Sequence, residues 1–371
     1  MDFQICTRCI MDTTDPEIVF DVNGYCNHCT TAIQQLTKGY LPNTEGQRRL
    51  DVILQRIRKD GKGKKYDCII GLSGGIDSSF LAWKTKNWGL RILLFHVDGG
   101  WNTEASRHNV HILAEKLGYD LHVYTIDWEE MRDLQVAYMK SGLANLDVPQ
   151  DHAFFAVLFK KCDEFGIPHW IAGMNLVSES ILPKAWGYTA LDSHQILDVH
   201  KRYGKRPLRT YPIISLWDYC KFYGNIPFIS SIQVHTPLNL MPYDVFAARE
   251  TLVNEAGWQN YGRKHEESLF TKLFQNYILP HKFGYDKRKA HYSSLIVSGV
   301  MTRDQALEAM KEPTYTDSEL AEDIRKVRER LELSEREWET IMNVPCATWQ
   351  DYANYESIKS FARKIKCLLR Q

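Results

Sequence analysis

The stretch that decides the fold is Tyr66–Ser79, which reads Y-D-C-I-I-G-L-S-G-G-I-D-S-S. Its first half is a short apolar run that ends in glycines and serines and is followed at once by a helix-like segment. This order is typical of a buried strand that feeds a tight loop. Gly74 and Gly75 have no Cβ, so backbone N–H groups can turn inward there and approach a ligand closely. Inward N–H groups at a helix N-terminus, together with the nearby serine hydroxyls, make an anion site.

The stretch is not a Walker A loop, because no Gly-Lys-Ser/Thr follows at the required spacing. The string S-G-G-I-D-S-S instead resembles the PP-loop of the ATP pyrophosphatases, where SGGxDS holds the pyrophosphate half of ATP. Those enzymes cleave ATP to AMP and pyrophosphate. The resemblance implies ATP and Mg²⁺ as ligands, with Asp77 helping to place the metal ion. It implies that ATP is bound by Leu72, Ser73, Gly74, Gly75, Asp77, Ser78 and Ser79, with residues 73–79 on the β- and γ-phosphates.

Alternating strands and helices follow this loop. We expect strands near 68–72, 91–97, 121–126 and 169–172, and helices near 79–88, 104–118 and 129–166, the last interrupted near Gly142 and Pro149. This βαβ rhythm predicts an α/β fold with a parallel, doubly wound sheet. Ligands of such sheets bind at the carboxyl ends of the strands.

Residues near two of those strand ends match ligand-binding positions of the PP-loop families that the loop resembles. Val97 and Asp98 match the place where such families read the edge of adenine. Gly173, with Asn175 two residues later, matches the place where a glycine lets the backbone approach the nucleotide. Glu179 matches the place of an acidic residue that binds magnesium, and a plain surface glutamate is the alternative.

Four cysteines lie within the first 30 residues, at Cys6, Cys9, Cys26 and Cys29. The spacing C-x2-C-x16-C-x2-C fits a four-thiolate Zn²⁺ knuckle. Four thiolates leave no open coordination position, so the zinc is expected to be structural. An iron–sulfur cluster is the alternative that the same soft ligands permit.

Cationic residues gather at two other places. Lys205 and Arg206 lie in an irregular segment that we expect to close over the triphosphate as a catalytic lid, since Arg grips phosphate bidentately. A solvated basic loop is the alternative. Farther on, basic segments flank the helical run 269–279 and are expected to meet and hold an anionic substrate. These substrate-binding candidates are Lys264, His265, His281, Lys282, Lys287 and Arg288.

Length and composition set the outer bounds. The chain has 371 residues and equal numbers, 46 each, of Lys+Arg and Asp+Glu. A protein that holds a long nucleic acid is usually basic, so no nucleic-acid partner is expected. No apolar run is long enough for a membrane span, and the N-terminus has no signal-peptide layout, so a cytoplasmic protein is expected. The predicted parts are a knuckle (1–40), a helical connector (41–65), a nucleotide-binding domain (66–215) and a mostly helical substrate and partner region (216–371).

Together these motifs, with H-V-D-G-G-W-N-T-E, I-A-G-M-N and the late string L-P-H-K-F-G-Y-D-K-R-K-A-H-Y-S-S-L-I, resemble the N-acetyl sugar amidotransferases of the WbpG and PseA type. The resemblance extends over almost the whole chain. It implies an ATP-dependent enzyme, forming AMP and pyrophosphate, that turns the acetamido group of a nucleotide-activated N-acetyl sugar into an acetamidino group. Such sugars serve bacterial surface polysaccharides such as O-antigen or flagellin glycans.

The nitrogen source in this reading is ammonia from partner subunits, a glutaminase and a cyclase-like barrel. A glutaminase needs an activated cysteine nucleophile. Residue 2 is Asp, and no cysteine lies in a G-x-C-x-G elbow, so this chain is expected to use ammonia without making it. The alternatives are a PP-loop tRNA sulfurtransferase and a nucleotide-binding subunit without turnover.

Overall fold

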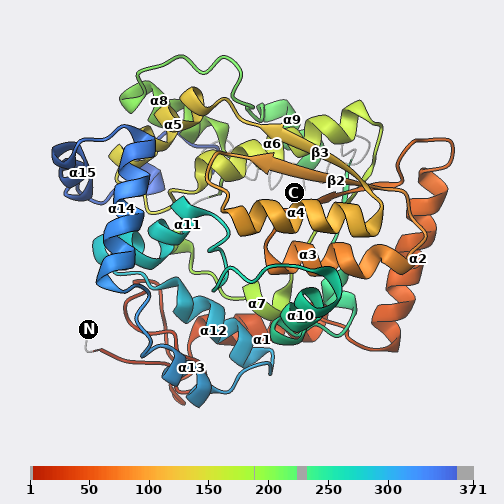
Figure 1. Ribbon diagram of the computed structural model, residues 1–371. Coiled ribbons are helices and arrows are strands. Elements are labelled where there is room, and N and C mark those ends of the chain that lie inside the picture. Colours follow the sequence, from red (N-terminus) through yellow and green to blue (C-terminus); the bar gives the residue numbers. More distant parts are fainter. Residues whose placement is uncertain (1–2, 188, 224–231, 357–371) are drawn as a thin grey trace, which may run out of the picture.

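A sheet of five parallel strands, in the order β3-β2-β1-β4-β5, lies at the centre of the molecule (Figure 1). The computed structural model describes residues 3–187, 189–223 and 232–356. The chain runs outward from β1 to β3 and then crosses back to β4, so the strand order reverses between β1 and β4. The strands are β1 (Cys68–Gly71), β2 (Ile92–Asp98), β3 (Asp120–Thr125), β4 (His169–Ile171) and β5 (Gln233–His235). The predicted parallel, doubly wound α/β sheet is confirmed.

Helices cover both faces of the sheet, because its central strands are apolar on both sides. On one face, Ile69, Leu93 and Trp170 pack in a core that takes in side chains of the three helices that precede and follow β4. On the other face, Ile70 and Leu94 share a core with a second set of helices. The first set is α5 (Trp128–Lys140), α6 (Val148–Glu164) and α8 (Ser193–Tyr203), and the second is α2 (Thr44–Asp60), α3 (Ile76–Lys84), α4 (Glu104–Leu117) and α10 (Val245–Thr251).

The predicted helical region 129–166 is divided into α5 and α6 where the sequence indicated. Gly142 has φ +71°, and an added Cβ there would lie 2.3 Å from the carbonyl oxygen of Pro345. Pro149 then lies in the first turn of α6, where its missing N–H costs no intrahelical hydrogen bond. This break brings the first turn of α6 to the carboxyl edge of the sheet.

The C-terminal half is mainly helical and packs on the sheet domain. Buried side chains of α14 (Asp317–Leu331) and α15 (Glu335–Met342) belong to the same core as those of α5 and α6. Capping boxes at Thr302 and Ser334 open α13 and α15. β5 also lies in this half and pairs with β4. The helices of this half include α9 (Leu216–Tyr223), α11 (Leu269–Leu273), continued as a π-type helix (Phe274–Phe283), then α12 (Lys287–Val297), α13 (Arg303–Ala309), α14 (Asp317–Leu331) and α15 (Glu335–Met342). The short helix α7 (Leu176–Glu179) comes earlier, directly after β4.

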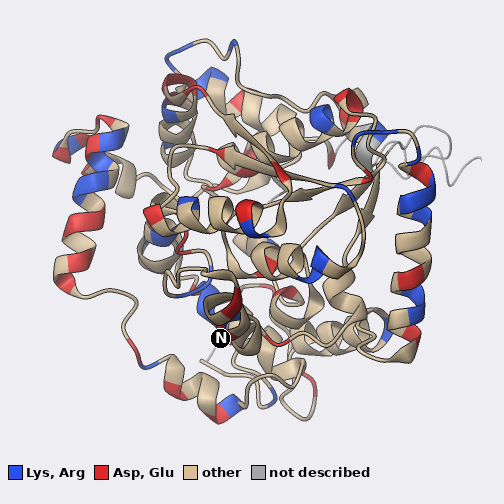
Figure 2. Cartoon of the chain, turned by 45° about the vertical axis from the view of Figure 1, so that its right-hand side comes forward, with Lys and Arg blue, Asp and Glu red and all other residues tan. Residues whose placement is uncertain are grey.

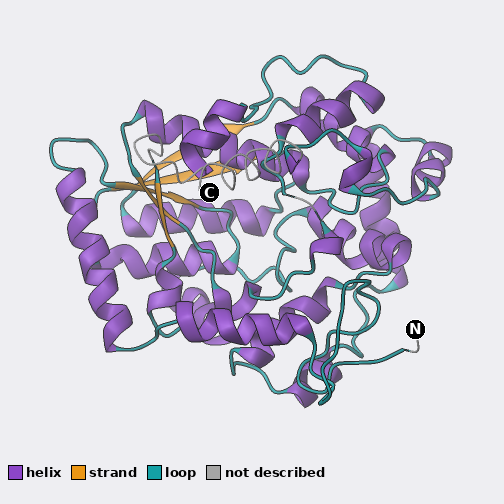
Figure 3. Ribbon diagram, turned by 180° about the vertical axis from the view of Figure 1, so that it is seen from behind, coloured by secondary structure: helices purple, strands orange, loops and turns teal. Residues whose placement is uncertain are grey.

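The N-terminal segment is mostly loop up to α1 (Asn27–Gly39), and it lies against α12 and α13 (Figures 1 and 3). The Arg303 guanidinium of α13 donates to the carbonyl oxygens of Cys6 and Cys9. The Ile10 N–H donates to Ser293 Oγ of α12 at 3.2 Å. The first residues of the chain are therefore attached to helices almost 300 positions away.

Charges of both signs are interspersed along the helices at the periphery (Figure 2), as expected of a chain with no net charge. Among the described residues, none of the helices combines the length and the apolar character that crossing a membrane requires.

Candidate active site

The loop between β1 and α3 is shaped by one glycine in a left-handed conformation. Gly74 has φ +83°, and a Cβ there would lie 2.6 Å from the carbonyl oxygen of Ser106. The indole of Trp258 and the amide of Asn109 donate to the Gly74 carbonyl, at 3.1 and 3.3 Å. The Ser106 hydroxyl donates to the Ser73 carbonyl at 2.9 Å. These hydrogen bonds orient the carbonyl oxygens of Ser73 and Gly74 toward α4 and toward the segment around Trp258.

Three N–H groups of the loop donate to hydroxyl oxygens. The N–H of Ser73 donates to Ser78 Oγ, that of Gly75 to Ser73 Oγ, and that of Ile76 to the Tyr261 hydroxyl, at 3.3, 3.2 and 3.0 Å. Hydroxyls are neutral and able to rotate, so an anionic oxygen is a stronger acceptor for the same N–H groups. The geometry fits an anion-binding loop.

A cavity of about 460 Å³ opens beside this loop, at the carboxyl ends of β1, β2 and β4. It lies where the strand order reverses, which is the usual ligand position in an open α/β sheet. Its walls come from the loop, the start of α6, and the segment from Tyr261 to Lys287. The sequence-predicted residues that line it are Leu72, Ser73, Gly75, Asp77, Ser78, Val97, Gly173, Glu179, Lys264, His265 and Lys287.

Lys264 is the centre of an ion-pair network in this cavity. Its Nζ lies 2.9 Å from Asp77 Oδ2, 2.8 Å from Glu179 Oε1 and 3.0 Å from the Ser178 hydroxyl. Burial opposes the charged ammonium, but the two carboxylates outweigh that cost and raise the pKa of Lys264 above its usual value. The Tyr243 hydroxyl donates to the other oxygen of Asp77. The structure thus brings Asp77 and Glu179 together around one cation.

A second pair of carboxylates faces the same cavity from α6. Asp147 and Asp151 are four residues apart, which places them on one side of the helix. Thr271 Oγ1 donates to Asp147 at 2.9 Å. Desolvation by the cavity wall, together with the Asp147 charge, raises the pKa of Asp151 to about 7. Burial lowers the pKa of Lys287, which faces both carboxylates and favours their charged forms.

Glu267 and His265 connect the loop to the C-terminal half. Burial raises the pKa of Glu267 to about 7, and its Oε2 has no hydrogen-bond partner among the described residues. A Cβ on Gly75 would lie 2.6 Å from Glu267 Oε1, so the two segments are closely apposed. His265 has φ +70°, an uncommon conformation for a residue with a side chain. Burial lowers the pKa of His265 well below its usual value.

The sequence reasoning missed Asp147, Asp151, Tyr243, Tyr261 and Glu267. The two aspartates had a signal, since a four-residue spacing beside a proline at a helix start points both carboxylates one way. The other three had none, because they reach the loop only through tertiary folding.

Four predicted nucleotide-binding residues support the cavity without lining it. Gly74 shapes the loop as described, and the buried Ser79 hydroxyl accepts from the Trp258 indole at 3.2 Å. Asp98 accepts from Gly100 N and Asn102 Nδ2. Asn175 caps α7, with its Oδ1 accepting from Ser178 N at 2.8 Å. The last contact fixes the turn that presents Glu179.

Lys205 and Arg206 are not at the cavity, which corrects the predicted lid. Both backbone N–H groups donate to Asp133 of α5, and the Arg206 guanidinium lies 3.0 Å from Glu129. Carboxylates of α5 therefore hold the basic segment on the outer surface. The catalytic role predicted for these two residues has no support in this arrangement.

Three of the six predicted substrate-binding cations also face elsewhere. Lys282 Nζ donates to the carbonyl oxygen of Ile341 at 2.7 Å, and exposed His281 stacks on Tyr277. Arg288 binds Asp286 and the carbonyl oxygen of Glu312. The expected meeting of two basic segments is thus limited to Lys264, His265 and Lys287, because the other side chains are held within the C-terminal half.

The four N-terminal cysteines converge as predicted. Their Sγ atoms all lie within 4.8 Å of one another, and all four residues are buried. The Sγ–Sγ distances are 3.8 Å for Cys6–Cys29 and 3.6 Å for Cys9–Cys26. A tetrahedron with Zn–S bonds of about 2.3 Å has edges of about 3.8 Å. The donor set fits one metal ion of the zinc type, held without an open position.

Comparison with known proteins finds a family model that matches the C-terminal part of the chain. Residues 267–366 match the model of the LPS biosynthesis protein WbpG-like C-terminal domain. This match covers only that part of the chain, agrees with the resemblance described from the sequence, and begins at Glu267, inside the cavity wall. A comparison with proteins of curated function finds no significant match.

Two solved structures show partial likeness. An NH3-dependent NAD synthetase from Campylobacter jejuni is 17% identical with a TM-score of 0.29, covering 42% of this chain and 72% of that one. An NMN synthetase from Francisella tularensis is 10% identical with a TM-score of 0.35, covering 84% of this chain and 94% of that one.

Proposed function

From the premise that residues 267–366 form a WbpG-like C-terminal domain, we propose that the protein is an ATP-dependent amidotransferase. It converts the acetamido group of a nucleotide-activated N-acetyl sugar into an acetamidino group and releases AMP and pyrophosphate. The product sugar belongs to a bacterial surface polysaccharide or flagellin glycan. Ammonia comes from a partner glutaminase with a cyclase-like subunit.

One observation carries this proposal. A single cavity joins the Ser73–Ser78 loop of the α/β domain to side chains of the WbpG-like segment, namely Glu267, Thr271, Gln275 and Lys287. A loop suited to polyphosphate and a segment suited to sugar modification therefore share one reaction space.

The loop end of the cavity is suited to the phosphates of ATP. The N–H groups of Ser73, Gly75 and Ile76 exchange their hydroxyl partners for phosphate oxygens, and Lys264 supplies a cation. Asp77 and Glu179 fit a Mg²⁺ ion, since their carboxylates already converge on one ammonium group. When bound there, Mg²⁺ neutralises phosphate charge and so favours departure of pyrophosphate.

The chemistry follows from the poor leaving ability of an amide oxygen. The acetamido oxygen attacks the α-phosphorus of ATP, the bond to the β-phosphate breaks, and pyrophosphate leaves with its electron pair. The adenylated imidate that forms carries AMP as a good leaving group. Neutral ammonia then attacks the imidate carbon, the C–O bond to AMP breaks, and an amidine remains.

The α6 end of the cavity is suited to the ammonia step. Ammonium must lose a proton before it attacks, and a base works best when its pKa lies near the operating pH. Asp151, whose pKa burial raises to about 7, accepts this proton. The negative charge of neighbouring Asp147 also contributes to the raised pKa of Asp151. Phe154 and Phe155 of the same helix line the cavity and reduce access of water to the imidate.

None of the described residues that line this cavity is a cysteine, which is in keeping with an external ammonia source. Among the cysteines whose side chains the structure describes, Cys68 and Cys162 are buried in the core, and Cys346 contacts the carbonyl oxygen of Lys282. Of these three, none lines the cavity. The partner's docking surface is proposed to include the helical part from residue 317 onward.

The test is to incubate the purified protein with ATP, Mg²⁺, an ammonium salt and a panel of nucleotide-linked N-acetyl sugars. The expected result is a product whose mass reflects replacement of O by NH, formed together with AMP. Asp77→Ala should abolish the product and leave the fold intact. Release of ADP in place of AMP, or unchanged sugars throughout the panel, would refute the proposal.

A further inference from the structure

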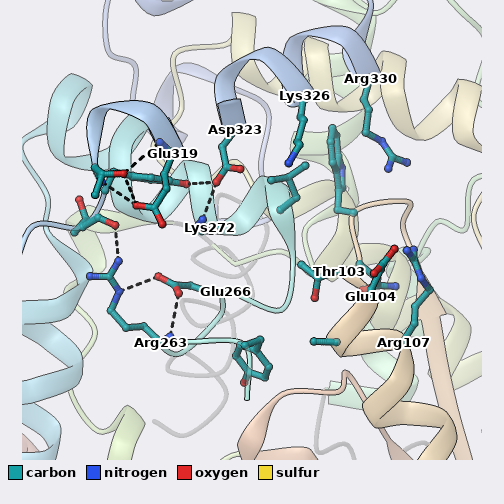
Figure 4. Close-up of a pocket in the computed structure, with 18 of the residues that line it drawn as sticks. Thr103, Glu104, Arg107, Arg263, Glu266, Lys272, Glu319, Asp323, Lys326 and Arg330 are labelled. Atoms are coloured by element: carbon teal, nitrogen blue, oxygen red, sulfur yellow. Dashed lines mark hydrogen bonds and ion pairs between the residues drawn. The ribbon is translucent and has the colours of Figure 1, made fainter. Parts of the chain in front are cut away.

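The structure also has a second, larger cavity of about 980 Å³ (Figure 4). It is enclosed by the start of α4, the turn before α11, and one side of α14. Asn102 and Tyr261 line both cavities. A backbone bridge between Asn102 and Ser268 holds the separating segments together. The two spaces are therefore neighbours across a wall that these few residues form.

The two cations at one end of this second cavity, Arg263 and Lys272, already have partners. Arg263 Nε lies 2.9 Å from Glu266 Oε1, and its other nitrogens donate to backbone carbonyls of Pro313 and Thr314. Lys272 Nζ lies 2.8 Å from Asp323. Glu319 adds a third carboxylate to this end, so no cation remains there for an anionic ligand (Figure 4).

The other end holds three cations that lack such partners in the cavity. Arg107 and Arg330 form no ion pair with any carboxylate of the described residues, and Lys326 lies 3.4 Å from Glu322 of its own helix. Figure 4 shows Lys326 and Arg330 projecting from α14 on the same side of the cavity as Arg107. Exposed Glu104 lies at the start of α4 nearby, where the helix dipole favours a negative charge.

Arg330 is held in place by aromatic rings. Its guanidinium carbon lies 5.3 Å from the centre of the Trp101 ring and 4.8 Å from that of Trp128. Trp101 is fully buried, so this platform is rigid. Gly100 permits the close packing, since a Cβ there would lie 2.5 Å from the Trp128 ring. This contact with the ring faces does not use the guanidinium N–H groups, which can bind phosphate in a bidentate way.

We propose that this second cavity binds the diphosphate part of the nucleotide-activated sugar, with Arg107, Lys326 and Arg330 as its contacts. The N-acetyl group then extends past Asn102 and Tyr261 into the first cavity, where ATP is cleaved. The assignment rests on the proposed function. The volumes of the two cavities agree with this assignment, because the first cavity must hold ATP and has less than half the volume of the second.

The test is a calorimetric titration of the full-length protein with UDP-, GDP- and dTDP-linked N-acetyl sugars. Saturating α,β-methylene-ATP, which cannot release AMP, occupies the first cavity throughout. The titration is repeated for Arg107→Ala and Arg330→Ala. Arg325→Ala is the matched control, because Arg325 lies on the same helix and pairs with Glu322 and Glu329.

At least one sugar nucleotide should bind beside the ATP analogue. Arg107→Ala and Arg330→Ala should each weaken that binding about tenfold or more. Affinity for the ATP analogue should stay unchanged, which shows that the variants are folded. Arg325→Ala should bind like the wild type.

Three results would overturn the assignment: no sugar nucleotide of the panel binds, the ATP analogue displaces it, or both variants bind it like Arg325→Ala. Arg107 is exposed at the start of α4, so Arg107→Ala still tests the site even if Arg330→Ala proves unstable. The titration is separate from the reaction. Sugar binding without amidine formation would refute the proposed function alone, and amidine formation with an unchanged KM in both variants would refute this site alone.

Discussion

Lys264 Nζ lies 2.9 Å from Asp77 Oδ2, although 187 positions separate the two residues. Asp77 belongs to the first turn of α3, and Lys264 precedes the WbpG-like segment. The same Nζ lies 2.8 Å from Glu179, which follows β4. One ammonium group therefore connects the loop, the neighbouring strand end and the C-terminal half at the position where the proposed reaction needs positive charge.

Replacing Lys264 by Met tests the role of this ammonium group in binding the phosphates of ATP. The variant leaves two carboxylates facing each other beside the phosphate site, so ATP binds more weakly and pyrophosphate is less well stabilised. A charge-assisted contact contributes about 1.5–3 kcal/mol, so kcat/KM for ATP should fall about tenfold to a hundredfold. ATP–pyrophosphate exchange in the presence of the sugar nucleotide measures this step.

Lys282→Met is the control for this prediction, because Lys282 lies in the same half of the chain and its Nζ binds a backbone carbonyl away from the cavity. Its exchange rate should match that of the wild type. Equal exchange rates for both variants would show that Lys264 has no part in handling phosphate.

Glu267→Gln should change how stability depends on pH. Burial raises the pKa of Glu267 to about 7 in the folded state, whereas an unfolded chain has a value of about 4.3. Between these values the folded state binds more protons, so wild-type stability falls as pH rises and levels off above about pH 7. Glutamine does not ionise, so the variant does not lose stability in this pH range. Compared with the wild type, its free energy of unfolding should be higher by about 1–3 kcal/mol at pH 8 and almost the same near pH 4.5.

Urea unfolding at a series of pH values measures the difference. Glu308→Gln is the control, since Glu308 is exposed and pairs with Lys311 on the surface. If the gain of Glu267→Gln is the same at pH 5 and pH 8, the buried carboxyl is not the cause.

The central fold was accessible from the sequence because the strands are short apolar runs followed by turn residues. Ile69, Ile70 and the apolar run of β2 predict buried parallel strands whatever the rest of the chain does. β5 was missed because Gln233–His235 has one apolar residue in three and is recruited only by pairing with β4. The cysteine cluster was also accessible, because metal ligation in small knuckles follows local spacing.

The site was accessible only where function follows local sequence. The loop and Gly173 were found, and a Cβ on Gly173 would lie 2.9 Å from Ser78 N, which explains why glycine is needed. The cationic residues were assigned less well, because a run of Lys and Arg does not reveal which carboxylates will satisfy it. Asp133 and Glu129 hold the 205–206 segment elsewhere, and only the folded chain shows that.

Removing the metal of the cysteine knuckle should disturb the active site from a distance. We expect about one zinc ion per chain, held by Cys6, Cys9, Cys26 and Cys29. The knuckle packs on α12, which carries Lys287, so Cys26→Ser should lower the melting temperature and weaken sugar-nucleotide binding together. Cys346→Ser, which changes an exposed cysteine, should do neither. Metal analysis and thermal unfolding measure both, and a metal-free protein of full stability would contradict the prediction.

Asp151→Asn should block the ammonia step and leave adenylation intact. Asparagine keeps the shape of the side chain but holds no proton at any working pH, and loss of a general base costs about 10²–10⁴ in rate. Amidine formation with ammonium salts should therefore fall by at least about a hundredfold, while ATP–pyrophosphate exchange continues. In the wild type, amidine formation should rise with pH as Asp151 loses its proton near pH 7 and as more ammonia becomes neutral. The variant should keep only the second, more alkaline dependence.

Asp163→Asn, on the same helix but paired with Lys221 outside the cavity, should behave as the wild type. A variant Asp151→Asn that lost exchange and amidine formation equally would place Asp151 in nucleotide binding, and one that lost neither would remove it from the reaction.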